Sequence, residues 1–198
     1  MTTILLAAGS ATRFGSQKLL ARLDDGRYVV EAAAQNLLAA GEEVIAVSSG
    51  DAALTRVLES SGCRVVINPR SVEGMGTSIA AGVCARPGAP YWLVALADMP
   101  FIRPATIALI SAAVSHERRI VVPVTGGQRG HPVAFGATYG EELMALAGDT
   151  GARSVVAAHA GAVTLLDVGD AGTLDDIDTP ADLARLRESH KTKREDPL

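Results

Sequence analysis

Short runs of β-branched and aliphatic residues recur along the chain and alternate with segments in which apolar residues follow helical spacing. Most of the runs are apolar at consecutive positions, so strands formed from them would be buried on both faces, as the strands of parallel sheets are. The expected strands are Thr3–Leu6, Val44–Val47, Val65–Ile67, Trp92–Leu96, Ile120–Val124 and Val163–Leu166.

Helices are expected between these strands. One apolar helical face follows the spacing i, i+3, i+4, i+7, i+8, and its members are Val30, Ala33, Ala34, Leu37 and Leu38. The other expected helices are Ala52–Ser60, Thr77–Ala85, Pro104–Val114 and Tyr139–Ala147. The alternation predicts an α/β protein with a doubly wound sheet, and ligands of such sheets bind at the carboxyl ends of the strands.

The chain has 198 residues, which suffices for one domain with a sizeable core. We expect this domain to span residues 1–187 and the polar residues 188–198 to form a disordered tail. No apolar run approaches the roughly 20 residues of a membrane span and no basic signal segment opens the chain, so we expect a cytoplasmic protein without a membrane partner. A net charge of -4 and a pI near 5.5 argue against a nucleic-acid partner. Cys63 and Cys84 form no CxxC pair, so neither a disulfide framework nor a zinc site is indicated.

The first strand runs directly into a loop that is bracketed by Gly9 and Gly15 and carries Arg13 and Lys18. Lys18 is the only lysine before Lys191 in a chain that otherwise uses arginine. Glycines let backbone N–H groups approach an anion, arginine can fork onto phosphate oxygens, and lysine supplies a compact charge. The loop matches neither the P-loop nor the GxGxxG pattern. It reads as a phosphate-binding loop, and the alternative is a surface turn with solvated cations.

An aspartate follows the expected buried strand Trp92–Leu96. Asp98 is the first polar residue after Leu93–Leu96, where a metal ligand would stand at the sheet edge. Alternatively, Asp98 only caps the turn into Pro100.

A second acidic group precedes the last helix. Thr179, Pro180 and Asp182 are explained as a helix start with a capping box. Asp176 and Asp178, with Asp175 beside them, are not needed for capping. Carboxylates this close repel one another unless a cation or solvent screens them, so the segment predicts either a magnesium site or a hydrated turn.

Several motifs in order carry a resemblance to a known family. They are LAAGSATRFGSQK at residues 6–18, ADMP at 97–100, GHPV at 130–133, GDTGAR at 148–153 and DIDTPADL at 176–183. With these motifs in this order, the chain resembles the nucleotidyltransferases related to the molybdenum cofactor cytidylyltransferase. The resemblance covers nearly its whole length, up to about Arg187. The implied fold is a Rossmann-like, three-layer α/β nucleotidyltransferase domain of the glycosyltransferase-A type. Ala97 and Phe14 stand where the family usually has Gly and Met, and neither change removes a charge.

The resemblance implies a reaction and a set of roles. CTP would bind with its phosphates on the opening loop and Mg²⁺ between Asp98 and Asp178, with Asp176 as the reserve ligand. The phosphate of the molybdenum cofactor, a phosphorylated pterin, would attack the α-phosphorus, and pyrophosphate would leave. Catalysis would fall to Lys18, Arg13 and Asp98, since the acceptor phosphate is already largely dianionic and needs no general base. The implied nucleotide contacts are Leu6, Ala7, Ala8, Gly9, Arg13, Lys18, Asn68 and Ser78, and the implied acceptor contacts are Gly130 and His131.

Some of these assignments have plain structural alternatives. Ser78 stands at a helix start, where it could instead satisfy backbone donors. The segment that contains Gly130 and His131 is equally consistent with a tight turn.

The choice of base rests on Ala8. Guanylyl-transferring relatives usually have Gly there, and the extra methyl group of Ala8 favours CTP. The alternatives are a guanylyltransferase, a transferase for another phosphorylated acceptor, an NAD(P)H-dependent reductase, and a non-catalytic maturation factor. A molybdoenzyme or its chaperone is a possible partner.

Overall fold

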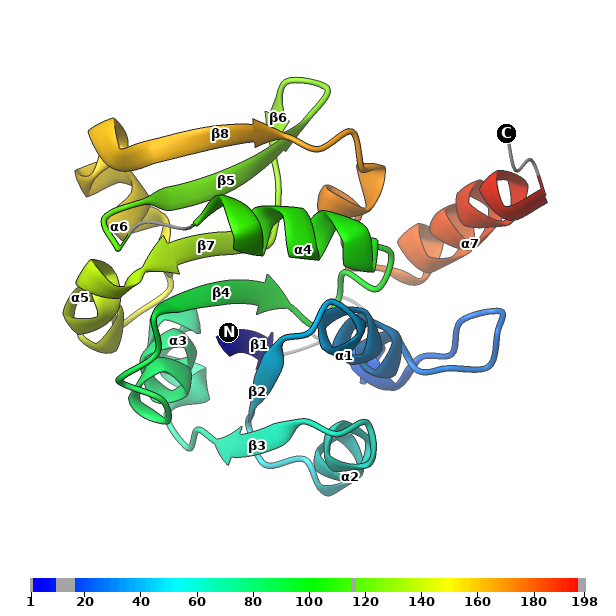
Figure 1. The fold of residues 1–198 in the computed structure, drawn as a ribbon. Coiled ribbons are helices and arrows are strands. Elements are labelled where there is room, and N and C mark those ends of the chain that lie inside the picture. Colours follow the sequence, from blue (N-terminus) through cyan, green and yellow to red (C-terminus); the bar gives the residue numbers. More distant parts are fainter. Residues whose placement is uncertain (1, 10–16, 115–116, 196–198) are drawn as a thin grey trace.

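The computed structural model describes residues 2–9, 17–114 and 117–195, with side chains up to 189. These residues form one eight-stranded sheet in the order β3-β2-β1-β4-β7-β5-β6, with β8 paired to β5 (Figure 1). The strands are β1 Thr2–Ala7, β2 Glu43–Ser48, β3 Arg64–Ile67, β4 Tyr91–Leu96, β5 Ile120–Thr125, β6 Gln128–Arg129, β7 Val133–Gly136 and β8 Val163–Asp167.

The sheet is mixed but mostly parallel. Strand β1 pairs in parallel with β2 and with β4. Strand β2 also pairs in parallel with β3, and β5 with β8. Strand β7 runs antiparallel between β4 and β5. All the expected strands are therefore confirmed, with ends shifted by at most one residue. Strands β6 and β7 were not expected, because one is two polar residues and the other is a short segment between Pro132 and the next turn.

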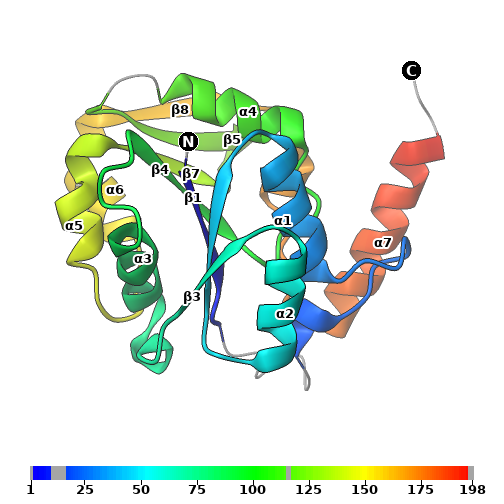
Figure 2. The ribbon, with the colours of Figure 1, turned by 60° about the horizontal axis from the view of Figure 1, so that its bottom comes forward.

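Helices cover both faces of the sheet. Figure 2 shows α1 and α2 on one side and α3, α5 and α6 on the other. Two separate clusters of buried side chains match this division: one joins Leu5 and Leu93 to α1, α2 and α4, and the other joins Ile4 and Trp92 to α3, α5 and α6. The helices are α1 Val29–Ala39, α2 Ala52–Ser60, α3 Met75–Cys84, α4 Pro104–Ala113, α5 Gly140–Met144, α6 Arg153–Ala158 and α7 Pro180–Glu195.

Three helices differ clearly from the expectation, and one of them, α6, was not expected at all. Helix α5 covers only part of the expected Tyr139–Ala147: it begins at Gly140, after a 3-10 turn at Ala137–Tyr139, and it ends at Met144. Helix α7 continues through Glu195, although a disordered tail was expected from residue 188. No glycine or proline interrupts residues 181–195, so nothing in the sequence stops the helix. Its first turns pack into the core through Leu183 and Leu186, and its far end projects from the molecule (Figure 1).

No helix in the described part of the chain is long and apolar enough to cross a membrane.

Candidate active site

The carboxyl ends of β1 and β4 meet at one edge of the sheet. Leu6 and Leu96 are partners in the parallel register, and the N–H of Ala97 donates to the carbonyl of Leu6 at 3.1 Å. Asp98 therefore lies next to the start of the opening loop. The N–H of Ile177 donates to the carbonyl of Asp98 at 3.0 Å, which brings the acidic segment before α7 to the same edge.

Lys18 lies between two of the expected carboxylates. Its Nζ donates to Asp98 Oδ2 at 2.7 Å and to Asp178 Oδ1 at 2.8 Å. The Lys18 side chain is 12% exposed, against 20% for Asp98 and 41% for Asp178. Burial alone would lower the pKa of Lys18, but the two carboxylates outweigh it and raise the pKa above its usual value. The ammonium therefore stays charged at neutral pH.

The local chain holds Lys18 in place. It begins a 3-10 turn, Lys18–Leu20, whose Leu19 is buried in the core. The N–H of Val29, at the start of α1, donates to the carbonyl of Ala21 at 2.9 Å. The ammonium is thus presented from a turn anchored to the first helix.

The two carboxylates fit a divalent cation. Asp98 Oδ1 is buried and has no hydrogen-bond partner among the described residues, although Asp98 Oδ2 bonds Lys18. An unsatisfied carboxylate oxygen beside a second carboxylate is the donor set that Mg²⁺ prefers, completed by water and phosphate oxygens. The described residues contain no group of three or more His, Cys, Asp or Glu side chains arranged to hold a metal alone. A cation at Asp98 and Asp178 would therefore need oxygens from the nucleotide or water.

Asp176, the reserve ligand, lies beside this pair. Burial raises its pKa, and the negative charges of Asp178 and Asp98 raise it further. No hydrogen bond joins Asp176 to Lys18 in the described part of the chain, which favours Asp178 as the second ligand.

The start of the opening loop is partly accessible. Ala7 is buried in the core, Ala8 and Leu6 are half-buried, and Gly9 is exposed. Leu6, Ala8 and Gly9 are thus at least partly accessible to a ligand, and Ala7 is not. Arg13 lies outside the described residues.

Asn68 and Ser78 come together, but inside the protein. Both are 4% exposed. Asn68 Nδ2 donates to Ser78 Oγ at 3.1 Å and to Thr77 Oγ1 at 2.9 Å. These hydrogen bonds hold the loop between β3 and α3 in its conformation. Asn68 and Ser78 would therefore influence nucleotide binding through the position of that loop and not by direct contact. At its end, the N–H of Gly76 donates to the carbonyl of Gly148 at 2.8 Å, which joins this loop to the GDTGAR motif.

Gly130 and His131 lie against the turn before the acidic segment. The N–H of His131 donates to the carbonyl of Thr173 at 2.9 Å, and a Cβ on Gly130 would collide with that carbonyl. His131 Nδ1 is buried without a partner among the described residues. Burial lowers the pKa of His131, the charge of Asp98 opposes this, and Arg153 lowers the pKa further. The imidazole is therefore neutral at neutral pH and within electrostatic range of Asp98.

Sequence reasoning missed Arg153 and Thr173 as neighbours of this site. Arg153 belongs to the GDTGAR motif, which was a usable signal. Thr173 carries no such signal, because its role here is a backbone carbonyl.

Comparison with known proteins identifies the family. The profile of the MobA-like NTP transferase domain matches residues 3–163. The chain belongs to this family. The resemblance drawn from its motifs is confirmed, and its class is nucleotidyltransferase of the MobA-like type.

Individual relatives of this MobA-like protein cover almost its whole length. Nicotine blue oxidoreductase of Paenarthrobacter nicotinovorans is 30% identical over 94% of this chain and 96% of its own. Rv0371C of Mycobacterium tuberculosis, solved as a complex with manganese, is 29% identical, with a TM-score of 0.77 over 95% of this chain and 98% of its own. A nucleotidyl transferase from Methanothermobacter superposes with a TM-score of 0.83 at 23% identity, over 97% and 98% of the two chains. The last likeness confirms the α/β nucleotidyltransferase fold.

Proposed function

We propose that this MobA-like protein transfers CMP from CTP to the phosphate of the molybdenum cofactor and releases pyrophosphate. The observation that carries the proposal is the convergence of Lys18, Asp98 and Asp178 at the carboxyl edge of the sheet. Lys18, together with a Mg²⁺ ion that the two carboxylates would hold, suits a nucleoside triphosphate, whose charge must be neutralised as the α-phosphorus is attacked.

The chain's own residues account for most of the chemistry. Lys18 neutralises phosphate charge and positions the triphosphate. Arg13 adds a second phosphate contact from the opening loop. Asp98 and Asp178 would hold Mg²⁺, which supplies further charge neutralisation when bound. No general base is required, because a phosphate monoester with a second pKa of about 6 is largely dianionic at neutral pH.

The acceptor would approach from the side of Gly130 and His131. The neutral imidazole presents a buried nitrogen without an internal partner, and Arg153 lies within electrostatic range of it. A neutral hydrogen-bonding group near a cation suits a phosphorylated heterocycle such as a pterin.

The preference for CTP rests on Ala8. Ala8 is half-buried next to the exposed Gly9, and its methyl group would narrow the space for a base bound there. A pyrimidine needs less room than a purine, so we place CTP ahead of GTP.

Pyrophosphate release tests the proposal. The protein is mixed with Mg²⁺ and molybdenum cofactor, and each of CTP, GTP, ATP and UTP is supplied in turn. We expect release with CTP and a cytidylylated cofactor by mass spectrometry. Release with GTP alone would make the protein a guanylyltransferase, and CTP binding without release would favour a non-catalytic maturation factor in contact with a molybdoenzyme.

An NAD(P)H-dependent reductase is the second candidate, because a relative 30% identical is named an oxidoreductase. The same preparation is therefore tested for oxidation of NADH and NADPH with nicotine blue and without CTP. Turnover there, with no pyrophosphate release under the first conditions, would replace the transferase proposal.

A further inference from the structure

The acceptor side of the proposed active site needs a positive charge of its own. A phosphate monoester carries nearly two negative charges at neutral pH, and it would approach the sheet edge at which Asp98 and Asp178 lie. Lys18 already contacts both of these carboxylates, and a metal ion held by them would be shared with the nucleotide. The acceptor phosphate would therefore be repelled by the carboxylates unless another cation lies beside its path.

Arg153 supplies such a cation. It is the first residue of α6, it is exposed, and it makes no hydrogen bond or ion pair with another of the described residues. Its charge nevertheless reaches His131. Burial lowers the pKa of His131 most, the charge of Asp98 opposes this effect, and the charge of Arg153 lowers the pKa further. The imidazole therefore lies within short electrostatic range of both Asp98 and Arg153.

Backbone contacts hold the loop in front of Arg153. The N–H of Gly76 donates to the carbonyl of Gly148 at 2.8 Å. A Cβ on Gly76 would lie 2.7 Å from the carbonyl oxygen of Ala147, and a Cβ on Gly74 would collide with Gly148. The loop before α3 and the loop before α6 are thus packed backbone to backbone, with no room for a side chain at either glycine. Arg153 therefore extends from a loop that is fixed in place.

Arg129 is the alternative cation on sequence grounds, because it lies two residues before His131. It is exposed on the short strand β6. The charges that act on the pKa of His131, however, are those of Asp98 and Arg153, and Arg129 is not among them. The electrostatics of the folded chain therefore favours Arg153 over Arg129.

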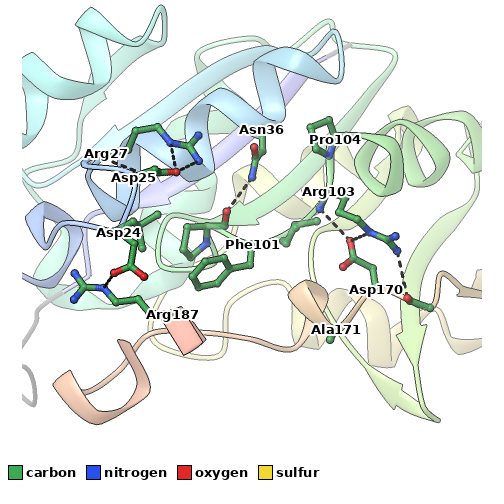
Figure 3. Close-up of a pocket in the computed structure, with 14 residues that line it drawn as sticks. Asp24, Asp25, Arg27, Asn36, Phe101, Arg103, Pro104, Asp170, Ala171 and Arg187 are labelled. Atoms are coloured by element: carbon green, nitrogen blue, oxygen red, sulfur yellow. Dashed lines mark hydrogen bonds and ion pairs between the residues drawn. The ribbon is translucent and has the colours of Figure 1, made fainter. Parts of the chain in front are cut away.

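Two other arginines lie near the segment that follows β4, but both are already paired. They line opposite ends of a cavity of about 560 Å³ (Figure 3). Arg103 Nε lies 3.3 Å from Asp170, and Arg187 Nε lies 3.4 Å from Asp24. The wall of this cavity contains no residue of the acceptor side. Its arginines are therefore held by carboxylates, away from the path of the acceptor.

We propose that Arg153 binds the phosphate group of the acceptor, beside His131, and thereby selects phosphate monoesters as the acceptor class. The inference rests on the proposed transferase function and names the residue that recognises the second substrate. A guanidinium can donate two parallel hydrogen bonds to a phosphate, and such charge-assisted bonds are about twice as strong as neutral ones. An acceptor of the same shape that carries only a hydroxyl group would lose this contact.

Steady-state kinetics with both substrates test the assignment. Arg153→Gln removes the charge and should raise the KM for the molybdenum cofactor about tenfold or more. The KM for CTP and kcat should change much less, because the contact involves only the acceptor and exists both before and during the transfer step. Arg153→Lys keeps the charge without the planar fork, so we expect an intermediate KM for the cofactor.

Two further arginines serve as controls. Arg129→Gln removes the cation that sequence alone would choose, and Arg56→Gln removes an exposed cation of α2, on the opposite face of the sheet from α6. Both variants should leave the two KM values nearly unchanged. A raised cofactor KM in Arg129→Gln with a normal one in Arg153→Gln would overturn the proposal in favour of Arg129.

Binding of a simple phosphate monoester tests Arg153 without turnover. Phenyl phosphate is titrated into the full chain with Mg²⁺ and a CTP analogue that has a methylene group between its α- and β-phosphorus atoms, and benzyl alcohol is the neutral probe. We expect only phenyl phosphate to shift the backbone amide NMR signals of His131, Arg153 and Ser154, and Arg153→Gln to remove these shifts. Equal shifts with benzyl alcohol, or shifts that persist in Arg153→Gln, would overturn the proposal.

The two proposals fail in different ways. CMP transfer with an unchanged cofactor KM in Arg153→Gln would remove the role of Arg153 and leave the transferase function standing. A protein that releases no pyrophosphate with any nucleotide would refute the transferase function. The phenyl phosphate titration, repeated without the CTP analogue, would then still decide whether Arg153 binds a phosphate monoester.

Discussion

The ammonium of Lys18 contacts two carboxylates that lie 80 and 160 residues away in sequence. An ammonium is a compact charge with three rotatable donors, whereas a guanidinium is a wide planar fork. Between the two carboxylates, and later between phosphate oxygens, the compact group is the better fit. The chain places arginine at its other cationic positions before residue 191, so lysine at this position is specific.

Replacing Lys18 tests whether its shape matters. Lys18→Arg keeps the charge, yet we expect turnover to fall severely. The planar guanidinium is too wide for the position that the Lys18 ammonium occupies between the two carboxylates. Lys18→Ala should lower kcat by about 10²–10³, with a smaller change in KM for CTP. Arg22→Lys, at an exposed cation stacked on Tyr28, is the control. A Lys18→Arg enzyme with unaltered turnover would reduce Lys18 to a generic charge.

Lys18 also competes with a divalent cation for the same oxygens. Lys18→Met removes the charge and keeps the length of the side chain, so Asp98 and Asp178 lose their internal partner. We expect the nucleotide-free variant to bind Mn²⁺ more tightly than the unsubstituted protein, as measured by the electron paramagnetic resonance signal of free Mn²⁺. Adding Asp98→Asn to Lys18→Met should abolish the gain. Equal Mn²⁺ affinity in all three proteins would mean that the carboxylates are not the cation site.

Asp98→Asn keeps the size of the side chain and removes its charge. We expect transfer to be abolished and the fold to be retained, and we expect Asp178→Asn to impair transfer strongly. Glu59→Gln, on the exposed side of α2, is the control. Turnover at limiting Mg²⁺ and the circular dichroism spectrum are measured together. Near-normal turnover of Asp98→Asn would contradict the two-carboxylate site.

At the scale of elements, the sequence was most informative where apolar runs are long. The strands that carry Leu6 and Leu96 are apolar at nearly every position, and the helix Ala52–Ser60 was predicted to the residue. Strand β7 was missed because its Val133–Gly136 is short and follows a proline. Helix α6 was missed because its six residues follow a glycine-rich motif that reads as a loop.

The site was partly predictable for the same reason. Asp98 and Lys18 follow strands that a periodicity argument finds, and parallel strands bring their carboxyl ends together. Their pairing with Asp178 was not deducible from spacing, since it depends on the bond between Ile177 and the carbonyl of Asp98. The burial of Asn68 was likewise invisible, because its partners are side chains across a loop.

The loop around Asp170 gives a prediction about stability and pH. Burial alone would raise the pKa of Asp170, but hydrogen bonds from Arg103 and Thr106 and the charge of Arg103 outweigh it and lower the pKa. The folded pKa is below the unfolded value, so the carboxylate stabilises the fold at neutral pH, and this stabilisation is lost as the pH falls through the folded pKa. Asp170→Asn should reduce the free energy of unfolding by about 1.5–3 kcal/mol at pH 7.

Urea denaturation at neutral and acidic pH measures this difference. We expect the gap between Asp170→Asn and the unsubstituted protein to shrink as the pH falls below about 4. Asp167→Asn, at an exposed carboxylate at the end of β8, should change little at either pH. A difference in the free energy of unfolding that does not change with pH would mean that the ionised Asp170 carboxylate does not stabilise the fold.

At the scale of the whole molecule, the candidate site joins parts of the chain that fold into different layers. The turn of Lys18 is anchored to α1, Asp98 follows the central strand β4, and Asp178 precedes α7. The acceptor side adds the turn at Thr173 and the segment at His131. A ligand that contacts these parts binds the folded state alone, so it stabilises the entire domain and not one loop.

Nucleotide binding should therefore raise the melting temperature of the protein. At about 100 times its dissociation constant a ligand adds about 2.7 kcal/mol to the folded state, which corresponds to roughly 5–10 °C for a domain of this size. We expect CTP with Mg²⁺ to give such a shift, GTP with Mg²⁺ a much smaller one, and Lys18→Ala with CTP a shift that is only moderately reduced at the same concentration. Differential scanning fluorimetry with each nucleotide, with and without Mg²⁺, measures these shifts. Equal shifts with CTP and GTP would contradict the role given to Ala8, and no shift with any nucleoside triphosphate would contradict the nucleotide site itself.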